Sequence, residues 1–547
     1  MESFSTVPPT PAEMERLRRS IANSVEQTLS DPASLGIALS ESIALGDWRL
    51  FFQLSDQALK ISAEEVAAAT QRYWRRDNRT VGTFVPEEMP QRAEMPVART
   101  STQAMQDFQP RAAVPAGEAF QPSHANIDAR TLRSRVGGVA LALLPRKTRG
   151  AAVSVALSLH MGDEKSLFGK QIVSQLAGDM LLRGTTKYSR QELADEFNRL
   201  NINGNLFTFT TTRQNLNDAL RLVAHVLREP SFPEPEFATF RNLIVTNTEA
   251  ARQEPQALAQ QAIAQHFNRY PRGDWRAPLT LDETLVQVQA TSRDEVRAFH
   301  RDFFGASNAE LSIVGDFDPG QAQQVIADTL GQWVSPSRYA WMEEAHFDVP
   351  PLRQVINTPD KENGFYLARL NLELRDDDPD YPALMVGGYL FGGAGMDSRL
   401  LQRIRQKEGW SYDGGAGFGV GALDRAASFT ISAIAAPQNL PRVEAAVREE
   451  LDRLRQQGFS AEEVAGAQSA LMQTNVRART QDANLASGWI DYLYLGRTFA
   501  WGKGLEDKIR ALTLEQVNAA WQRAIDPAQL SVVLAGDQAK LPPNKAP

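Results

Sequence analysis

The chain has 547 residues, no cysteine and a formal net charge of −8. Since domains of roughly 150 residues are typical, this length predicts three or four structural units. The acidic balance argues against nucleic acid or an anionic membrane surface as the main partner. No apolar run reaches the length of about 18 residues that a membrane-spanning helix needs. The lack of cysteine excludes disulfides, thiolate metal sites and a cysteine nucleophile.

The first 85 residues are expected to form helices and one strand. Thr10 and Pro11 make a helix start, with a hydroxyl cap followed by proline at the first helical position. Apolar residues then recur at helical spacing, and helical sequence continues to about residue 75. A short apolar strand, Thr80–Val85, follows. Helices with one strand and no sheet to cover amount to half of a domain.

Residues 86–125 are expected to be an extended linker. They contain six prolines among glutamine, alanine and glutamate, without periodicity. Beyond them, the expected order of strands and helices over residues 126–335 occurs again over residues 345–540, after a short connector. The sequence therefore divides into a helical tail, a linker and two similar domains.

An internal repeat is the strongest organisational signal in the chain. Three similar segments each lead through a helix towards a strand: Ile61–Val66, Thr291–Val296 and Leu512–Val517. They predict three endings of one domain type, although only two complete domains precede them. The expected fold is α+β: tandem domains, each an antiparallel-rich sheet covered by helices, with residues 1–85 as the C-terminal tail of a preceding copy. We expect the chain to be the C-terminal part of a longer protein, or one subunit that complements another.

A glycine loop opens the stretch Phe391–Tyr412, which contains the best candidate site. Gly392, Gly393 and Gly395 are expected to take backbone conformations closed to other residues. The loop lacks the Gly-Lys-Ser/Thr ending and the preceding apolar strand of a phosphate cradle, so nucleotide binding is not expected. Turn formation alone is the competing explanation for these glycines.

Arg405 and Tyr412 stand seven residues apart in the same stretch. If the helix between them ends at Gly409, the cation of its last turn and the phenol at the start of the next strand both face one cleft. Such a pair can stabilise negative charge on a bound substrate. The alternative is an arginine paired with an acid and a tyrosine packed on a sheet.

The two copies resemble the insulinase/pitrilysin family of zinc metallopeptidases, which includes the mitochondrial processing peptidases and their bacterial relatives. The segments that resemble it are Gln-Leu-Ala-Gly-Asp-Met-Leu-Leu-Arg-Gly-Thr at 175–185 and Ser-Arg-Leu at 398–400, followed by Arg405 and Gly-Trp-Ser-Tyr at 409–412. In that family the first helix carries HxxEH, then Met-Leu, a basic residue and Gly-Thr. The two histidines and a later glutamate bind zinc, and the glutamate between the histidines is the general base.

The chain departs from that motif at every zinc position. Gln175 and Asp179 stand where the histidines would be, Gly178 replaces the general base, and the later ligand maps to Asn247. Glutamine and asparagine are poor zinc ligands beside imidazole, and glycine cannot move a proton. The six histidines give no HxxH or HxxEH spacing either. We therefore expect no metal or other cofactor in this chain, and a helix at Gln175 that serves packing.

Arg405 and Tyr412 match the signature of the family's non-zinc half. The resemblance implies that they reach across to the zinc half and hydrogen-bond the peptide near its scissile carbonyl, while the glycine loop contributes to substrate recognition. The chain is then the substrate-binding half of a peptidase and is inactive alone. Its implied partner is an N-terminal, HxxEH-bearing half or a partner subunit, which supplies the zinc, the water and the general base.

A catalytically dead scaffold or assembly subunit is the alternative function. An HxxEH stretch ahead of Met1 in the native reading frame, or in an adjacent partner, favours the peptidase; its absence favours the scaffold. The resemblance also implies the periplasm, since many bacterial relatives are exported. The first residues, Met1–Pro8, lack the basic and apolar regions of a signal peptide.

Overall fold

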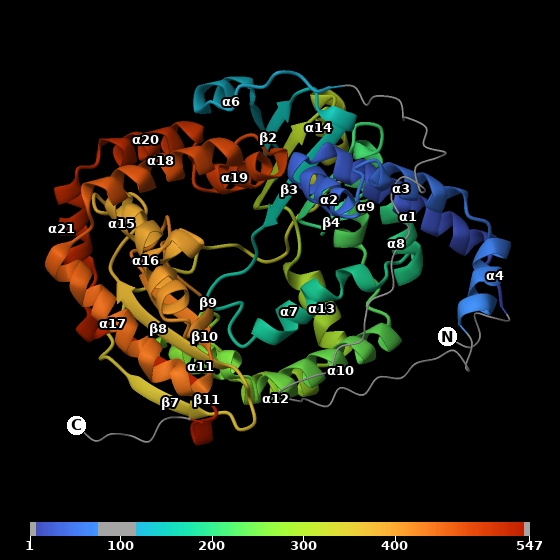
Figure 1. The fold of residues 1–547 in the computed structure, drawn as a ribbon. Coiled ribbons are helices and arrows are strands. Elements are labelled where there is room, and N and C mark those ends of the chain that lie inside the picture. The colour runs from blue at the N-terminus through green and yellow to red at the C-terminus, as the bar shows by residue number, and fades with distance from the viewer. Residues whose placement is uncertain (1–6, 75–115, 541–547) are drawn as a thin grey trace.

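The computed structural model describes residues 7–74 and 116–540 (Figure 1). The expected strand Thr80–Val85 and most of the expected linker lie outside these ranges. None of the described helices is long and apolar enough to cross a membrane. The described chain consists of four N-terminal helices and two helix-covered sheets.

The first complete copy is built on a sheet whose strands lie in the order β1-β2-β6-β3-β5-β4. These strands are β1 (Leu132–Val136), β2 (Val139–Pro145), β3 (Ala152–Leu159), β4 (Asn203–Gly204), β5 (Thr208–Thr212) and β6 (Ala309–Gly315). Its helices are α6 (His124–Arg130), α7 (Gln171–Asp179), α8 (Arg190–Arg199), α9 (Leu216–Arg228), α10 (Glu234–Ala251), α11 (Pro255–Phe267), α12 (Leu281–Ala290), α13 (Arg293–Phe303) and α14 (Pro319–Asp328). Strands β2 and β6 are parallel, and the other neighbours are antiparallel.

The second copy is built on a sheet of order β7-β11-β8-β10-β9. Its strands are β7 (Arg353–Asn357), β8 (Gly364–Leu372), β9 (Ser411–Gly419), β10 (Ala427–Ala435) and β11 (Ser531–Gly536). Its helices are α15 (Tyr381–Gly388), α16 (Arg399–Leu401), α17 (Leu440–Gln457), α18 (Ala461–Ala478), α19 (Asp482–Tyr494), α20 (Phe499–Ala511) and α21 (Leu514–Ala524). Two π-helical turns, Tyr389–Gly393 and Gln402–Lys407, flank α16.

The two sheets share one topology. Without its extra edge strand β1, the first sheet reads β2-β6-β3-β5-β4, and the second has the corresponding strands in the same positions. In both, the first strand pairs in parallel with the last strand of the copy, and the remaining pairs are antiparallel. The expectation of an α+β fold made of repeated, antiparallel-rich domains is confirmed.

Four helices precede the first copy within residues 7–74: α1 (Pro11–Ser30), α2 (Pro32–Ala44), α3 (Leu50–Lys60) and α4 (Ala63–Tyr73). Helix α1 begins where the sequence predicts, because the Thr10 hydroxyl accepts a hydrogen bond from the Glu13 amide and the Glu13 carboxylate returns one to Thr10. The helix packs against α8, with Arg16 Nε 2.6 Å from Asp195 Oδ1. Figure 1 shows the four helices, in blue, beside the first copy.

Each copy contributes one helix that packs on the sheet of the other copy. Helix α11 of the first copy lies on β8 and β11, and α19 of the second copy lies on β3 and β6. The contacts are apolar and buried: Ala259, Ile263 and Phe267 meet Phe365, Leu367, Val533 and Ala535, and Leu485, Ala486 and Trp489 meet Ala142, Leu144, Ala156 and Val314. The exchange joins the two copies into one structural unit (Figure 1).

Candidate functional site

The structure brings Arg405 and Tyr412 together. Arg405 lies in the π-helical turn Gln402–Lys407, and Tyr412 is the second residue of β9. The guanidinium carbon of Arg405 lies 5.6 Å from the centre of the Tyr412 ring, within reach of a cation–π contact. The glycine stop between them has the expected geometry, since Gly409 has a φ of 64° and ends the turn.

Neither side chain of this pair has a polar partner within residues 7–74 and 116–540. Tyr412 is 76% exposed, and no hydrogen bond or ion pair to the described residues involves its hydroxyl or the Arg405 guanidinium. The other two arginines of the stretch are paired with glutamates: Arg399 with Glu463 and Glu450, and Arg403 with Glu408 and Glu449. The donors of Arg405 and Tyr412 are therefore available to a ligand.

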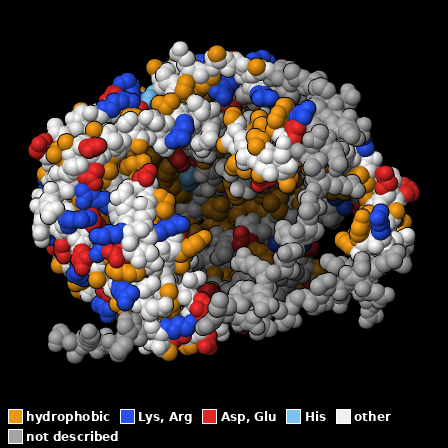
Figure 2. Space-filling model, viewed as in Figure 1, with side chains coloured by type: hydrophobic (Ala, Val, Ile, Leu, Met, Phe, Trp, Pro, Cys, Tyr) orange, Lys and Arg blue, Asp and Glu red, His pale blue; other side chains and the backbone are white. Residues whose placement is uncertain are grey.

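A hollow lies in the middle of the face that Figure 2 shows. In the same view of the ribbon, the hollow is bordered by β9 and α16 of the second copy and by β3 and α7 of the first (Figure 1). Hydrophobic side chains gather on its wall (Figure 2). The helix that carries the zinc-motif positions and the strand that carries Tyr412 thus border the same hollow.

The glycine loop packs directly on the strand that carries Tyr412. A Cβ atom at Gly392 would lie 2.3 Å from the backbone nitrogen of Ala416 in β9, so only glycine allows this approach. Gly395 has a φ of 58°, in the left-handed region. Gly393 has neither feature, since its φ is negative and a Cβ there would meet no atom closer than 3.4 Å. The expectation of a special backbone conformation holds for Gly395 and is wrong for Gly393, while Gly392 is needed for space.

Gly392→Ala is expected to lower the free energy of unfolding by about 1–3 kcal/mol, because the added methyl group forces the loop away from the β9 backbone. Denaturant unfolding measures this cost. The matched control is Gly393→Ala in the same turn, which places its methyl group at ordinary contact distance and is expected to change stability by less than about 1 kcal/mol. Equal effects of the two substitutions would contradict the close approach.

Three of the expected degenerate zinc positions, Gln175, Gly178 and Asp179, lie on α7. Ile172, Leu176 and Ala177 bury one face of this helix in the first core, whereas Gln175 and Asp179 are exposed. Partial burial raises the pKa of Asp179 above its ordinary value, and a hydrogen bond from Gln175 opposes that shift.

Gly178 and Asn247 complete the degenerate set. A Cβ atom at Gly178, where the resemblance places the general base, would meet nothing within 4 Å. Asn247 is exposed on a different helix, α10, and no hydrogen bond joins it to Gln175 or Asp179 in the described part of the chain. Nowhere among the described residues do three or more histidine, cysteine, aspartate or glutamate side chains gather as metal ligands.

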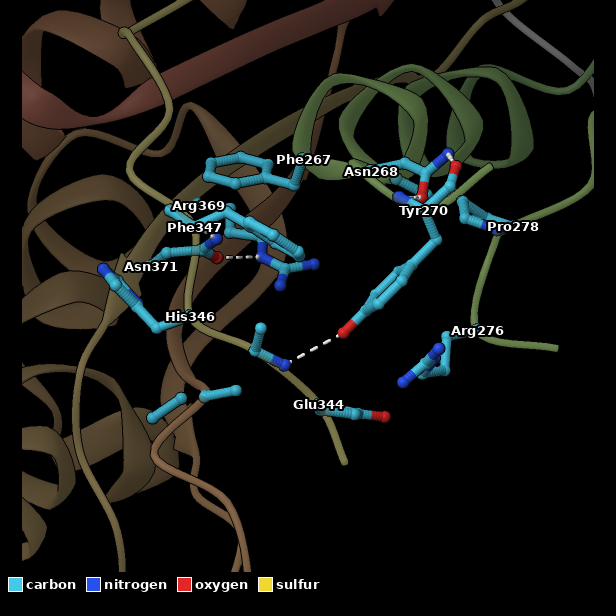
Figure 3. A pocket seen from close by; sticks show the side chains of 14 residues that line it. Phe267, Asn268, Tyr270, Arg276, Pro278, Glu344, His346, Phe347, Arg369 and Asn371 are labelled. Carbon is cyan, nitrogen blue, oxygen red and sulfur yellow. Dashed lines mark hydrogen bonds between the residues drawn. The ribbon is translucent and has the colours of Figure 1, made fainter. Parts of the chain in front are cut away.

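A pocket that the sequence analysis missed lies where the two copies meet (Figure 3). Its volume is about 250 Å³, and Arg369 of β8 is among its lining residues. The available signal was the alternation Phe365, Leu367, Arg369, which places a charge on the apolar face of a strand. The sequence alone does not show that α11 covers this face.

Family comparisons point to one group of peptidases. The family profile described as Peptidase M16 inactive domain matches residues 290–471. An uncharacterized zinc protease of Rickettsia bellii is 25% identical over 346 residues, which cover 61% of this chain and 78% of the relative. The uncharacterized zinc protease YmxG of Bacillus subtilis is 20% identical over 386 residues, which cover 67% of this chain and 89% of the relative.

Solved structures show the same fold. A peptidase M16 inactive domain from Pseudomonas fluorescens superposes with a TM-score of 0.66 and 19% identity, over 76% of this chain and all of that one. The periplasmic protease PqqL of Escherichia coli superposes with a TM-score of 0.61 and 13% identity, over 97% of this chain and 61% of that one. Residues 290–471 thus match the inactive domain of peptidase M16, and the expected resemblance of the chain to the insulinase/pitrilysin-type zinc metallopeptidases is confirmed.

Proposed function

We propose that this chain is the substrate-binding, non-zinc half of a metallopeptidase that acts on peptides. The observation that carries the proposal is the pair Arg405 and Tyr412, which lie together with no polar partner among the described residues. A guanidinium and a phenol can both donate to the carbonyl oxygen of a peptide, and they stabilise the charge that this oxygen develops during cleavage.

The residues of this chain do not fit a zinc ion. Gln175, Gly178, Asp179 and Asn247 offer one carboxylate between them, and Gly178 has no group that could accept a proton. A partner half with an intact HxxEH motif would hold the metal and the general base. The present chain has the role of binding the peptide and positioning its carbonyl group.

The N-terminal helices support the presence of such a partner. Helices α1–α4 have 20, 13, 11 and 11 residues, α10–α13 have 18, 13, 10 and 11, and α18–α21 have 18, 13, 13 and 11. The fourth helix of each run begins with a capping box: Ser62 with Glu65, Ser292 with Glu295, and Thr513 with Gln516. We infer that residues 1–85 are the end of a preceding repeat.

The second helix of each complete run, α11 or α19, lies on the sheet of another copy. Helix α2 holds this place in the first run, yet its Ile37 and Ile43 are 63% and 59% exposed. Covering each such side chain is worth about 1.5–3 kcal/mol. We infer that this face of α2 docks on the sheet of the HxxEH-bearing half.

Substitution of both isoleucines by glutamate tests the pairing. The chain is mixed with a separately expressed HxxEH-bearing half, taken from the upstream reading frame or an adjacent partner, and association and peptide cleavage are measured together. Ile37→Glu with Ile43→Glu is expected to weaken association at least about tenfold, because two charges would be buried against a sheet. The control is Val286→Glu on α12, equally exposed but outside α2. Unchanged association of the double variant would contradict the docking.

The periplasm is the proposed compartment, because the similar protein PqqL is described as a periplasmic protease. The scaffold alternative predicts that Arg405 and Tyr412 can be replaced without loss of any activity of the assembled protein. The kinetics of those variants therefore separate the two functions.

A further inference from the structure

A pocket of about 250 Å³ lies between the end of α11, the connector that precedes β7, and strands β8 and β10. Figure 3 shows Phe267, Tyr270 and Phe347 around it, with Arg369 reaching in from β8. The Tyr270 hydroxyl accepts a hydrogen bond from the Ala345 amide at 2.9 Å, which ties the connector to the loop after α11. The pocket is thus walled by aromatic rings from both sides of the contact between the copies.

Arg369 is a half-buried cation that has no acidic partner within residues 7–74 and 116–540. Its Nε donates to Asn371 Oδ1 at 3.1 Å, and its guanidinium carbon lies 4.7 Å from the centre of the Phe267 ring. Its terminal nitrogens have no hydrogen bond or ion pair to the described residues, and in Figure 3 the guanidinium points toward Tyr270. Burial lowers the pKa of Arg369, which shows that its charge is poorly solvated. Such a cation favours an anion beside it.

Two other charged side chains of this pocket, Arg276 and Glu344, form no ion pair with Arg369. Arg276 is fully engaged: its terminal nitrogens contact Asp274 and Glu164 at 2.8 and 2.9 Å and the backbone carbonyl of Glu343. Glu344 is exposed on the connector and forms no ion pair with Arg369, although its charge acts on that residue. Arg369 is therefore the pocket cation that a ligand can neutralise.

The matching place in the first copy is filled by protein side chains, one of which, Tyr494, comes from α19 of the second copy. The last strands of the two copies, β6 and β11, end at Gly315 and Gly536. Five residues before these glycines stand Glu310 and Ser531, whose antiparallel partners are Ser158 and Arg369, respectively. Ser158 and Arg369 therefore hold equivalent positions in the two sheets. Around Ser158, His160 contacts Glu310 at 2.7 Å and stacks on Tyr494 at 4.4 Å between ring centres, and Tyr494 hydrogen-bonds Tyr339 at 2.5 Å. In the first copy this position is filled by a cluster of hydrogen-bonded polar side chains. In the second copy it is a cavity that contains Arg369, whose charge has no acidic partner among the described residues.

We propose that the pocket binds a small organic carboxylate, with Arg369 as its counter-ion and the rings of Phe267, Tyr270 and Phe347 around its hydrocarbon part. A guanidinium can hold a carboxylate through two parallel hydrogen bonds. A single free cation matches a single negative charge, and Glu344 on the connector disfavours more highly charged anions such as phosphate. The site is independent of the function proposed for Arg405 and Tyr412.

Calorimetric titration of the full chain tests the site with phenylacetate, its neutral isostere phenylacetamide, and inorganic phosphate. Phenylacetate is expected to bind saturably, and the amide and phosphate at least about tenfold more weakly. Arg369→Gln is expected to weaken phenylacetate binding by about tenfold or more. The matched control is Arg442→Gln, which removes an exposed arginine of α17, on the other face of the same sheet.

Glu344→Gln provides a second variant whose folding is not at risk, because the side chain is exposed. It is expected to strengthen the binding of phenylacetate and of phosphate severalfold, since it removes a repelling charge. The proposal is overturned if the acid and the amide bind alike, if phenylacetate shows no saturable binding, or if Arg369→Gln leaves its affinity unchanged.

Discussion

Arg405→Ala is expected to lower kcat of the chain assembled with its HxxEH-bearing half by about 10²–10³-fold, the usual cost of one donor to a developing oxyanion. Apart from the Tyr412 ring, Arg405 has no partner among the described residues whose loss could account for such an effect through folding. The zinc content of the assembly is expected to stay the same, because Arg405 is not one of the expected zinc positions. Tyr412→Phe removes only the hydroxyl and is expected to cost about tenfold. Steady-state kinetics and metal analysis on the same samples measure both quantities.

Lys407→Ala is the matched control for this experiment. Lys407 is an exposed cation in the same π-helical turn, two residues from Arg405, and its loss removes the same charge without the partner ring. Its kcat is expected to stay within about twofold of the unsubstituted chain. Unchanged kinetics of Arg405→Ala would refute the substrate contact, and loss of zinc with activity would indicate a role in assembly instead.

Trp489→Ala is expected to lower the free energy of unfolding by about 3 kcal/mol. Trp489 is fully buried on α19, between that helix and the sheet of the first copy, and its ring lies 5.1 Å from that of Phe499. Removing a buried tryptophan side chain typically costs about 3–5 kcal/mol. The lower end is expected because the indole nitrogen is buried without a hydrogen-bond partner in the described residues, so its removal also relieves a penalty.

Denaturant unfolding followed by circular dichroism measures the Trp489 effect, and limited proteolysis shows whether the two copies separate. The control is Val476→Ala on α18, a half-exposed apolar residue outside the exchange, with an expected change below about 1 kcal/mol. A loss below 1 kcal/mol for Trp489→Ala would show that α19 contributes little to holding the copies together.

The repeat could be predicted from the sequence because its marks are local. The capped starts after Ile61, Thr291 and Leu512 depend on residues three apart, and such short-range chemistry is readable without a structure. The exchange of α11 and α19 was not predictable in this way. An apolar helical face shows that a helix is covered, but the choice of sheet is a long-range contact.

The same difference between local signals and long-range contacts applies to the candidate site. The meeting of Arg405 and Tyr412 follows from seven residues and a glycine stop, so the sequence could indicate it. The approach of Gly392 to Ala416 is a contact between a loop and a strand, so the expectation of a special backbone conformation is wrong for both Gly392 and Gly393. Arg369 was missed because its apolar surroundings come from α11, more than a hundred residues earlier.

Zinc analysis combined with a peptide-cleavage assay, on this chain alone and with the HxxEH-bearing half, shows whether the zinc site lies in this chain or in its partner. We expect no bound zinc and no cleavage for the chain alone, and zinc-dependent cleavage once the partner is added. Stoichiometric zinc and cleavage by the chain alone would contradict the assignment of Gln175, Gly178 and Asp179 as lost zinc positions, and with it the division of labour between two halves.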